Sequence, residues 1–270
     1  MTARSGPPAL LELATTAAQQ AADLLLDGLG RARTTVETKS TATDMVSEMD
    51  RASEQLIVSS LLAARPDDGL VGEEGSASRG TSGVRWVIDP LDGTTNYLYG
   101  HPGWAVSIAA EDDAGVVVGV VIDPMHGDVF TATRGGGARR NREAIACTPL
   151  DDVSTALVAT GFGYAADRRR AQAEVLVALL PRIRDIRRMG AAAVDLCSVA
   201  CGRVDAYFER GLAWWDLAAG GLIAAEAGAL VSAIEGGPAG PDAGSIVAAG
   251  PGLFTTLREL LSSLGTHDVS

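Results

Sequence analysis

The sequence predicts an α/β protein, built either as one large domain or as two subdomains that share an interface. The chain opens with a helical pattern over residues 9–29, and its middle carries consecutive strand patterns. Residues 156–264 then alternate strands with helices. A chain of 270 residues with 47% apolar content can also bury a large core.

The opening helix is amphipathic, because apolar residues recur at helical spacing from Leu10 to Leu25 and glycines stop the pattern. A polar segment over residues 34–43 follows. It contains Lys39, the one lysine in a chain whose remaining 21 basic residues (22 less one) are arginines. Two explanations remain open: a genome that replaces Lys by Arg, or a site that needs a compact ammonium group where a planar guanidinium would not fit.

The next two elements each bring a carboxylate. Residues 44–50 lead into a helix that ends before Pro66, with Asp50 near its first turn. A short strand then delivers Glu73, followed by Glu74, at its end. Taken alone, Asp50 is a helix-start residue and the two glutamates are solvated surface.

Residues 86–96 read Trp-Val-Ile-Asp-Pro-Leu-Asp-Gly-Thr-Thr-Asn and predict a metal and phosphate site. The first three suit a buried strand that ends at Asp89, because Pro90 stops ladder pairing. Asp89 and Asp92, three residues apart beyond the strand, can converge on hard cations, and the Leu91 carbonyl between them can add a ligand.

The same stretch then predicts a helix start. Gly93 permits a tight turn, and Thr94 and Thr95 open a helix whose free N–H groups and positive dipole end would hold a phosphate beside the metals. For Asp-Pro-x-Asp-Gly alone, an Asx-type turn with a Thr N-cap is the alternative.

Strand patterns over residues 104–110, 115–122 and 128–132 predict an antiparallel sheet. The glycine run 135–137, which precedes three arginines, predicts a solvated hairpin turn. A phosphate cradle is disfavoured because no strand-to-helix context accompanies the run, and the sequence contains no P-loop motif.

A composition shift near residues 148–152 marks a second half. Its predicted strands cover residues 156–160, 185–188, 204–209 and 246–249, and its predicted helices cover residues 169–180, the segment after Gly190, the segment from Asp216 and residues 253–264.

The turn at Gly190, Ala191 and Ala192 can direct backbone N–H groups toward a polar ligand. Arg187 or Arg188 could add a phosphate contact there, although a solvated surface position is the alternative reading. On the helix that follows, Cys197 and Cys201 are interpreted as small core residues rather than as a zinc site, because no histidine or third thiol is near.

Charge and cysteine content limit the classes of partner and compartment. A formal charge of −12 and a pI near 4.7 argue against nucleic acid or an anionic membrane as the main partner. Three cysteines point to a reducing compartment, and we expect the cytoplasm. No targeting signal or membrane-spanning apolar run is predicted.

Residues 86–96 resemble the inositol monophosphatase signature W-x-I-D-P-[IL]-D-G-T-x-N. The spacing of Lys39, Asp44 and Asp50 is similar to a second motif of that family, and Val-Gly-Glu-Glu precedes the signature at the family's distance. Trp-Asp-x-Ala-x-Gly, which contains Asp216, is similar to a third motif. The resemblance covers nearly the whole chain.

The resemblance implies an alternating α-β-α-β-α sandwich that forms one domain over residues 1–270. An N-terminal α+β subdomain would cover about residues 8–150, and a C-terminal α/β subdomain about residues 151–265. Family members commonly form homodimers. Their partners are small phosphomonoesters rather than membranes or nucleic acids.

The resemblance also implies two or three Mg²⁺ ions and lithium inhibition. Five carboxylates in one pocket would in any case be untenable without cations or raised pKa values. Glu73, Asp89 and the Leu91 carbonyl would hold one ion, and Asp89, Asp92 and Asp216 a second. Glu73 and Thr94, with Asp50 behind Thr94, would orient the attacking water. Substrate contacts would come from Asp92, Gly93, Thr94, Thr95, Arg187, Gly190, Ala191, Ala192, Glu209 and Asp216, with Lys39 auxiliary.

Glu209 matches the family position that binds ring hydroxyls, so inositol 1-phosphate is the preferred substrate. Family members often carry Ser or Thr where this chain has Ala191, which removes one hydroxyl contact. Fructose 1,6-bisphosphate, histidinol phosphate and nucleotide phosphates remain alternatives from other branches. A regulatory protein that binds transcription machinery is the alternative from another class.

Overall fold

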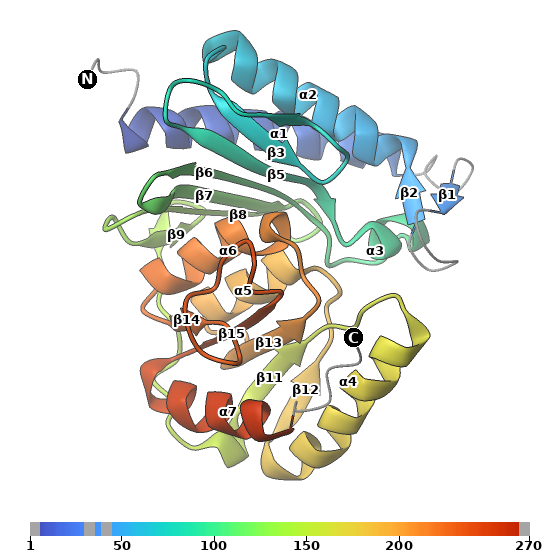
Figure 1. The fold of residues 1–270 in the computed structure, drawn as a ribbon, viewed down its shortest axis with the longest axis vertical. Coiled ribbons are helices and arrows are strands. Elements are labelled where there is room, and N and C mark those ends of the chain that lie inside the picture. Colours follow the sequence, from blue (N-terminus) through green and yellow to red (C-terminus); the bar gives the residue numbers. More distant parts are fainter. Residues whose placement is uncertain (1–5, 30–35, 39–44, 265–270) are drawn as a thin grey trace.

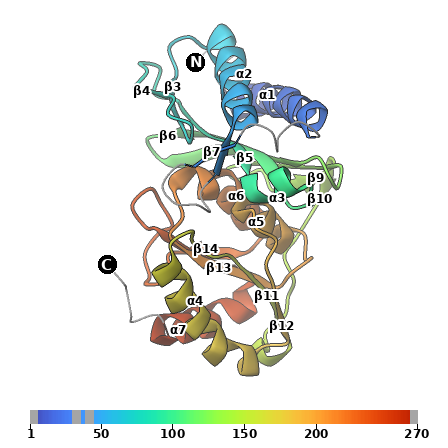
Figure 2. The ribbon, with the colours of Figure 1, turned by 90° about the vertical axis from the view of Figure 1, so that its right-hand side faces the viewer.

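Five alternating layers of helix and sheet make up the protein in this computed structural model, which describes residues 6–29, 36–38 and 45–264 (Figure 1). Helices α1 and α2 cover one face of the first sheet, and α5 and α6 lie between the two sheets (Figures 1 and 2). Helices α4 and α7 form the outermost layer beside the second sheet. This order confirms the α-β-α-β-α fold.

The first sheet has eight strands in the order β10-β9-β8-β7-β6-β5-β3-β4. Every neighbouring pair is antiparallel except β3 and β5, which run parallel. The strands are β3 (Gly69–Gly72), β4 (Ala77–Ser78), β5 (Arg85–Asp92), β6 (Ala105–Asp112), β7 (Gly115–Asp123), β8 (Asp128–Thr133), β9 (Ala138–Arg140) and β10 (Glu143–Ala144). The predicted antiparallel sheet over residues 104–132 is therefore confirmed.

Helix α1 (Pro7–Gly28) begins with prolines, which its unbonded first turn tolerates, and packs on β6 and β7. The face against the sheet is rich in alanine, so the helix backbone approaches the strands closely. Helix α2 (Glu48–Ala64) lies beside α1 and ends before Pro66, as predicted. In the chain between α1 and α2, strands β1 (Val36–Thr38) and β2 (Met45–Ser47) form an antiparallel pair.

The prediction that the central strand ends at Asp89 is wrong. Strand β5 pairs with β6 at Asp89 and again at Asp92, and the register shifts between these two pairs. The irregularity takes up Pro90, whose missing N–H would otherwise break the ladder. Both aspartates therefore belong to one strand that is distorted between them.

The second sheet has the order β12-β11-β13-β15-β14. Strand β11 runs parallel to β12 and β13, whereas β15 is antiparallel to β13 and β14. Its strands are β11 (Leu157–Thr160), β12 (Asp185–Arg187), β13 (Ala206–Arg210), β14 (Leu230–Ser232) and β15 (Ser245–Ala249). Apart from β14, all of them were predicted to within two residues at each end.

Helices α5 (Ala192–Ala200) and α6 (Trp214–Glu226) are rich in small residues, which lets them pack against each other between the sheets. Helix α6 begins at Trp214, two residues before the predicted start at Asp216. Cys197 is fully buried in the core, as expected, and Cys201 is half-buried. Among the described helices, none is long and apolar enough to cross a membrane.

Helix α4 (Ala166–Leu179) begins three residues earlier than predicted, and α7 (Pro251–Leu264) closes the described chain. Short 3-10 turns occur at Val153–Thr155 and Leu180–Arg182. The first sheet lies before residue 150 and the second after it, but α5 and α6 pack against both. The division into subdomains near that residue therefore stays a prediction.

The glycine run 135–137 forms the predicted hairpin turn, between β8 and β9. The backbone N–H groups of Gly135 and Gly137 donate to the two carboxylate oxygens of Glu226, over 2.7 and 2.8 Å. These donors thus bind an anion of the chain itself, at the end of α6.

Candidate active site

A cavity of about 390 Å³ lies where residues of the two sheets meet. Ten of the predicted site residues line it: Glu73, Asp89, Leu91, Asp92, Gly93, Thr94, Gly190, Ala192, Glu209 and Asp216. The others that line it are Gly161, Phe162, Gly163, Tyr164, Arg168, Arg188, Gly211, Leu212, Ala213 and Trp215. Residues more than 120 positions apart in the sequence therefore form one site.

The irregular segment of β5 shapes the carboxylate end of this cavity. The Leu91 N–H donates to Asp89 Oδ1 over 3.1 Å, and Ser53 Oγ from α2 donates to the Pro90 carbonyl over 2.9 Å. Asp89 is only 1% exposed. These contacts fix a buried acid in the distorted part of the strand.

Gly93 lies between the last residue of β5 and the first residue of the short helix α3 (Thr94–Tyr99), and its φ is 89°. A Cβ at this position would lie 2.7 Å from the Gly103 carbonyl oxygen, so only glycine fits without a shift. The Thr94 hydroxyl lies 3.1 Å from the Leu91 carbonyl oxygen and 3.5 Å from Asp50 Oδ1. Asp50, 2% exposed, therefore lies beside the Thr94 hydroxyl.

Asp92 joins this end of the site to the second half of the chain. Its Oδ2 accepts a hydrogen bond from the Ala193 N–H in α5, over 2.6 Å. Asp216 is held similarly, because its Oδ2 accepts from the Ala213 N–H over 2.7 Å at the start of α6. Both carboxylates are thus oriented by backbone donors near helix N-termini.

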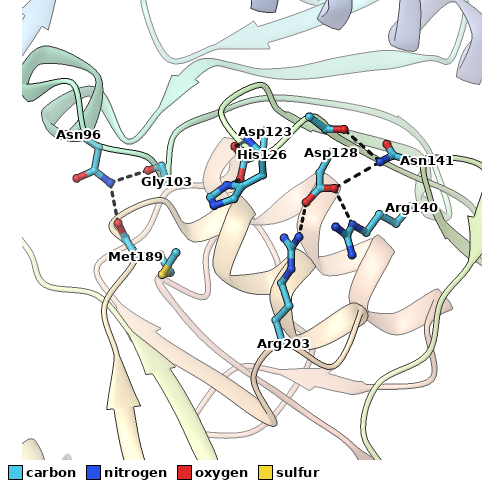
Figure 3. Close-up of polar contacts among 10 residues, drawn as sticks. Asn96, Gly103, Asp123, His126, Asp128, Arg140, Asn141, Met189 and Arg203 are labelled. Carbon is cyan, nitrogen blue, oxygen red and sulfur yellow. Dashed lines mark hydrogen bonds and ion pairs between the residues drawn. The ribbon is translucent and has the colours of Figure 1, made fainter.

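Asn96, the last residue of the central motif, has a role that the sequence did not reveal. Its Nδ2 donates to the carbonyls of Gly103 and Met189, over 2.6 and 2.7 Å (Figure 3). Met189 immediately precedes Gly190, which lines the cavity. This amide therefore joins α3 to the segment that leads into the Gly190 turn. A motif position without charge gave no signal for this.

The carboxylates of the cavity repel one another electrostatically. Burial raises the pKa of Asp89 well above its usual value, and the nearby charges of Glu73, Asp92 and Asp216 raise it further. Burial likewise raises the pKa of Asp92 to about 7, although the Ala193 hydrogen bond opposes the shift. Burial and the charge of Asp92 also raise the pKa of Asp216 well above its usual range.

This donor set fits a hard cation. The candidate ligands are buried carboxylate oxygens whose mutual repulsion a cation would relieve, and neither thiol nor imidazole lines the cavity. Across the described part of the chain, no three His, Cys, Asp or Glu side chains already converge as a finished cage. The acids instead lie around the cavity wall, where Asp89, Asp92 and Asp216 each accept a backbone hydrogen bond.

Four predicted site residues do not line the cavity: Thr95, Ala191, Arg187 and Asp50. Arg187 is exposed and pairs with Asp185, 2.8 Å away, which agrees with the solvated surface position that was its alternative reading. Its neighbour Arg188 lines the cavity instead. Lys39 lies outside the described residues, as does Asp44.

The sequence patterns did not predict several residues that line the cavity. Phe162, Tyr164 and Trp215 bring aromatic surface, and Arg168 brings a second guanidinium. Arg168 also lines a larger neighbouring cavity of about 930 Å³, together with Gly211. The closely spaced glycines at 161 and 163 were the available signal for a loop that approaches a ligand.

Figure 3 also shows two polar clusters whose residues do not line the cavity. His126 contacts Asp123, 2.7 Å away, and does not line the cavity. Asp128, 1% exposed, forms ion pairs with Arg140 and Arg203, over 2.7 and 2.6 Å. These contacts join β8, β9 and the segment after α5.

Comparison with known proteins gives consistent results. The inositol monophosphatase family profile matches residues 8–265. An inositol-1-monophosphatase of Mycobacterium leprae is 45% identical over 236 residues, which cover 84% of this chain and 81% of that protein. A protein of Vibrio cholerae named Nus factor SuhB is 40% identical over 244 residues, covering 90% and 91%. The solved structure of Mycobacterium tuberculosis SuhB superposes with a TM-score of 0.82 at 39% identity, covering 96% of this chain and 98% of that one.

Proposed function

The chain belongs to the inositol monophosphatase family, and we propose that it is a Mg²⁺-dependent phosphatase that hydrolyses myo-inositol 1-phosphate. One observation carries this proposal. The cavity brings buried, mutually repelling carboxylates together with Glu209 and the aromatic residues Phe162, Tyr164 and Trp215. The repelling carboxylates would suit cations and a phosphoryl group, and Glu209 with the aromatic residues would suit a polyhydroxylated alcohol.

Glu73, Asp89, Asp92, Asp216 and the Leu91 carbonyl would hold two or three Mg²⁺ ions. Bound there, Mg²⁺ would neutralise the carboxylates and withdraw charge from the phosphoryl oxygens. The chain's own part is to align the groups around the phosphorus.

Thr94 and Asp50 would take part in proton transfer. The Thr94 hydroxyl can donate to the Leu91 carbonyl or to Asp50, and Asp50 is buried behind it. A water positioned beside Thr94 and Glu73 would therefore have an acceptor for its proton on both sides. The backbone at Gly93, Thr94 and Thr95 would face the phosphate.

Glu209 would accept hydrogen bonds from ring hydroxyls, and the aromatic side chains would exclude water from the alcohol. As part of the same proposal, the protein is a cytoplasmic homodimer whose turnover is inhibited by lithium.

Phosphate release from a substrate panel tests this function. The panel contains myo-inositol 1-phosphate, fructose 1,6-bisphosphate, histidinol phosphate, a nucleoside monophosphate and p-nitrophenyl phosphate, each with Mg²⁺ or with EDTA. We expect the highest kcat/KM for myo-inositol 1-phosphate and no turnover in EDTA. Release that persists in excess EDTA contradicts the metal requirement, and no release from any substrate contradicts the enzyme.

Matched variants locate the activity. Asp216→Asn removes a cavity charge while keeping an oxygen for the Ala213 N–H, and turnover should be lost. Asp205→Asn makes the same change at a carboxylate that accepts from the Leu157 N–H outside the cavity, and turnover should persist. Equal activity of the two variants would remove Asp216 from the site.

A second candidate function is binding to the transcription machinery, which the name of the Vibrio cholerae relative favours. Purified transcription complexes captured by wild-type protein and by Asp216→Asn would test it. Capture by both forms supports a binding role that is independent of turnover, and capture by neither contradicts it.

A further inference from the structure

Glu209, which lines the cavity, has a hydrogen-bond partner on its own strand. The Tyr207 hydroxyl donates to Glu209 Oε2 over 2.7 Å. Both residues lie on β13, two positions apart, so their side chains leave the same face of the strand. Tyr207 is fully buried, and it does not line the cavity itself.

Gly161 supports the same carboxylate from the neighbouring strand. Strand β11 runs parallel to β13 and ends at Thr160, opposite Phe208, so residue 161 passes beside Glu209. A Cβ at position 161 would overlap the Glu209 carboxylate. The carboxylate therefore lies against bare backbone, in space that any larger residue would fill.

Charge keeps this contact in one protonation pattern. Burial raises the pKa of Tyr207 well above its usual value, and the nearby Glu209 charge raises it further, so the phenol stays protonated and donates. Burial also raises the pKa of Glu209, whereas the Tyr207 hydrogen bond and the Arg188 charge oppose that shift. The phenol thus favours the carboxylate form, which is the form that accepts hydroxyl hydrogen bonds.

We propose that Tyr207 is a positioning residue for substrate selection: its hydroxyl fixes the Glu209 carboxylate against Gly161, ready to accept hydrogen bonds from the hydroxyls of the leaving alcohol. The proposal rests on the phosphatase function above. A carboxylate already held in one place loses less conformational freedom when the alcohol binds. Tyr207 therefore acts through Glu209 and touches neither the phosphate nor the carboxylates that would hold Mg²⁺.

The first test is Tyr207→Phe, which removes one oxygen and keeps the ring. We compare myo-inositol 1-phosphate with p-nitrophenyl phosphate, whose leaving group has no ring hydroxyls. The ratio of their kcat/KM values should fall about tenfold, the effect of weakening a hydrogen bond to a charged group, and the change should appear mainly in KM. An unchanged ratio overturns the proposal.

Tyr97→Phe is the matched control. Tyr97 is also fully buried, and its hydroxyl donates over the same 2.7 Å, but to the Leu25 carbonyl in α1. Thermal unfolding should show a similar loss of stability in both variants, and only Tyr207→Phe should alter the substrate ratio. A change of equal size in Tyr97→Phe would show that lost stability, rather than positioning, moves the ratio.

A double-mutant cycle decides whether Tyr207 works through Glu209. In a Glu209→Ala background, Tyr207→Phe should no longer change the ratio, because the group that it positions is gone. A full additional tenfold change in that background overturns the proposal.

Gly161→Ala reaches the carboxylate from the other side, at a residue whose φ is outside the left-handed region, so the backbone accepts alanine. We expect the same selective fall in the ratio, and an unchanged ratio would contradict the proposal. Wild-type protein that releases no phosphate from any substrate overturns the phosphatase function and this role with it. Wild-type activity with unmoved ratios overturns only the role of Tyr207.

Discussion

Replacing Asp92 by asparagine should stabilise the protein in the absence of metal, and more so at alkaline pH. Asp92 is 9% exposed, and its folded pKa is raised from 3.8 to about 7, chiefly by burial. An acid whose folded pKa is raised favours the folded state at low pH, and that contribution is lost as pH rises through the folded value. Asparagine has no charge to bury and can still accept the Ala193 N–H.

The magnitude follows from the two pKa values. Above the folded pKa, the buried charge costs about 4 kcal/mol, from a difference of roughly three at about 1.4 kcal/mol for each pKa unit. At pH 5 the Asp92 side chain is already ionised in the unfolded chain and still protonated in the folded protein, so part of this cost is already present. Between pH 5 and pH 8 the cost rises further, by up to about 3 kcal/mol. Relaxation of the neighbouring acids would reduce this, so we expect the advantage of Asp92→Asn to grow by about 1–3 kcal/mol between these pH values.

Thermal unfolding in EDTA, followed by circular dichroism at both pH values, measures the difference. A gain of 1 kcal/mol corresponds to about 2–4 °C in a chain of this size. Asp205→Asn, outside the cavity, should not show the alkaline gain. Added Mg²⁺ should stabilise wild-type protein at pH 8 more than the Asp92→Asn variant. A variant that is equally or less stable than wild type at pH 8 would refute this account of the carboxylate cavity.

Three further predictions concern the turn at Gly93, the ion pairs of Asp128 and the cavity wall at Arg168. Gly93→Ala should lower the melting temperature and abolish turnover, because its φ of 89° and the Gly103 carbonyl both oppose a Cβ; unchanged melting would show that the turn adapts. Asp128→Ala should reduce the free energy of unfolding by about 2–3 kcal/mol, which urea titration measures. The loss should be smaller than the roughly 3–5 kcal/mol typical of breaking a fully buried ion pair, because both arginine partners are about one-third exposed. Arg168→Ala should raise kcat/KM for phosphates of bulky alcohols relative to p-nitrophenyl phosphate, because the side chain stands between the two cavities; no relative gain would show that the wall is elsewhere.

The layered fold and the carboxylate end of the site could be predicted because their signals are local. Apolar spacing shows helices and strands, and the central motif carries its acids within a few residues. The shift of register in β5 was not predictable in this way, since it depends on how β6 pairs with each side of Pro90. A proline read alone indicates only that a strand stops.

The part of the cavity wall that comes from the second half of the chain was harder to predict, because it is assembled from distant segments. Arg187 and Arg188 are adjacent and chemically identical, yet Arg187 is the last residue of β12, whereas Arg188 follows the strand and lines the cavity. Arg187 shares a strand face with Asp185, two positions away, and pairs with it. Sequence patterns do not fix which face of an edge strand looks into a cavity, and the aromatic walls come from loops with no periodicity.

The Asn96 amide has a consequence for the chemical ageing of the protein. Its nitrogen donates to both the Gly103 and the Met189 carbonyls, so this one amide joins α3 to the segment that leads into the Gly190 turn. Hydrolysis of that side chain to aspartate would replace two donated hydrogens by an oxygen that faces two carbonyl oxygens, and attraction would become repulsion. Both sheets would keep their own pairing, while α3 and the segment before the Gly190 turn lost this contact. One deamidation can therefore disturb the cavity wall while the secondary structure remains intact.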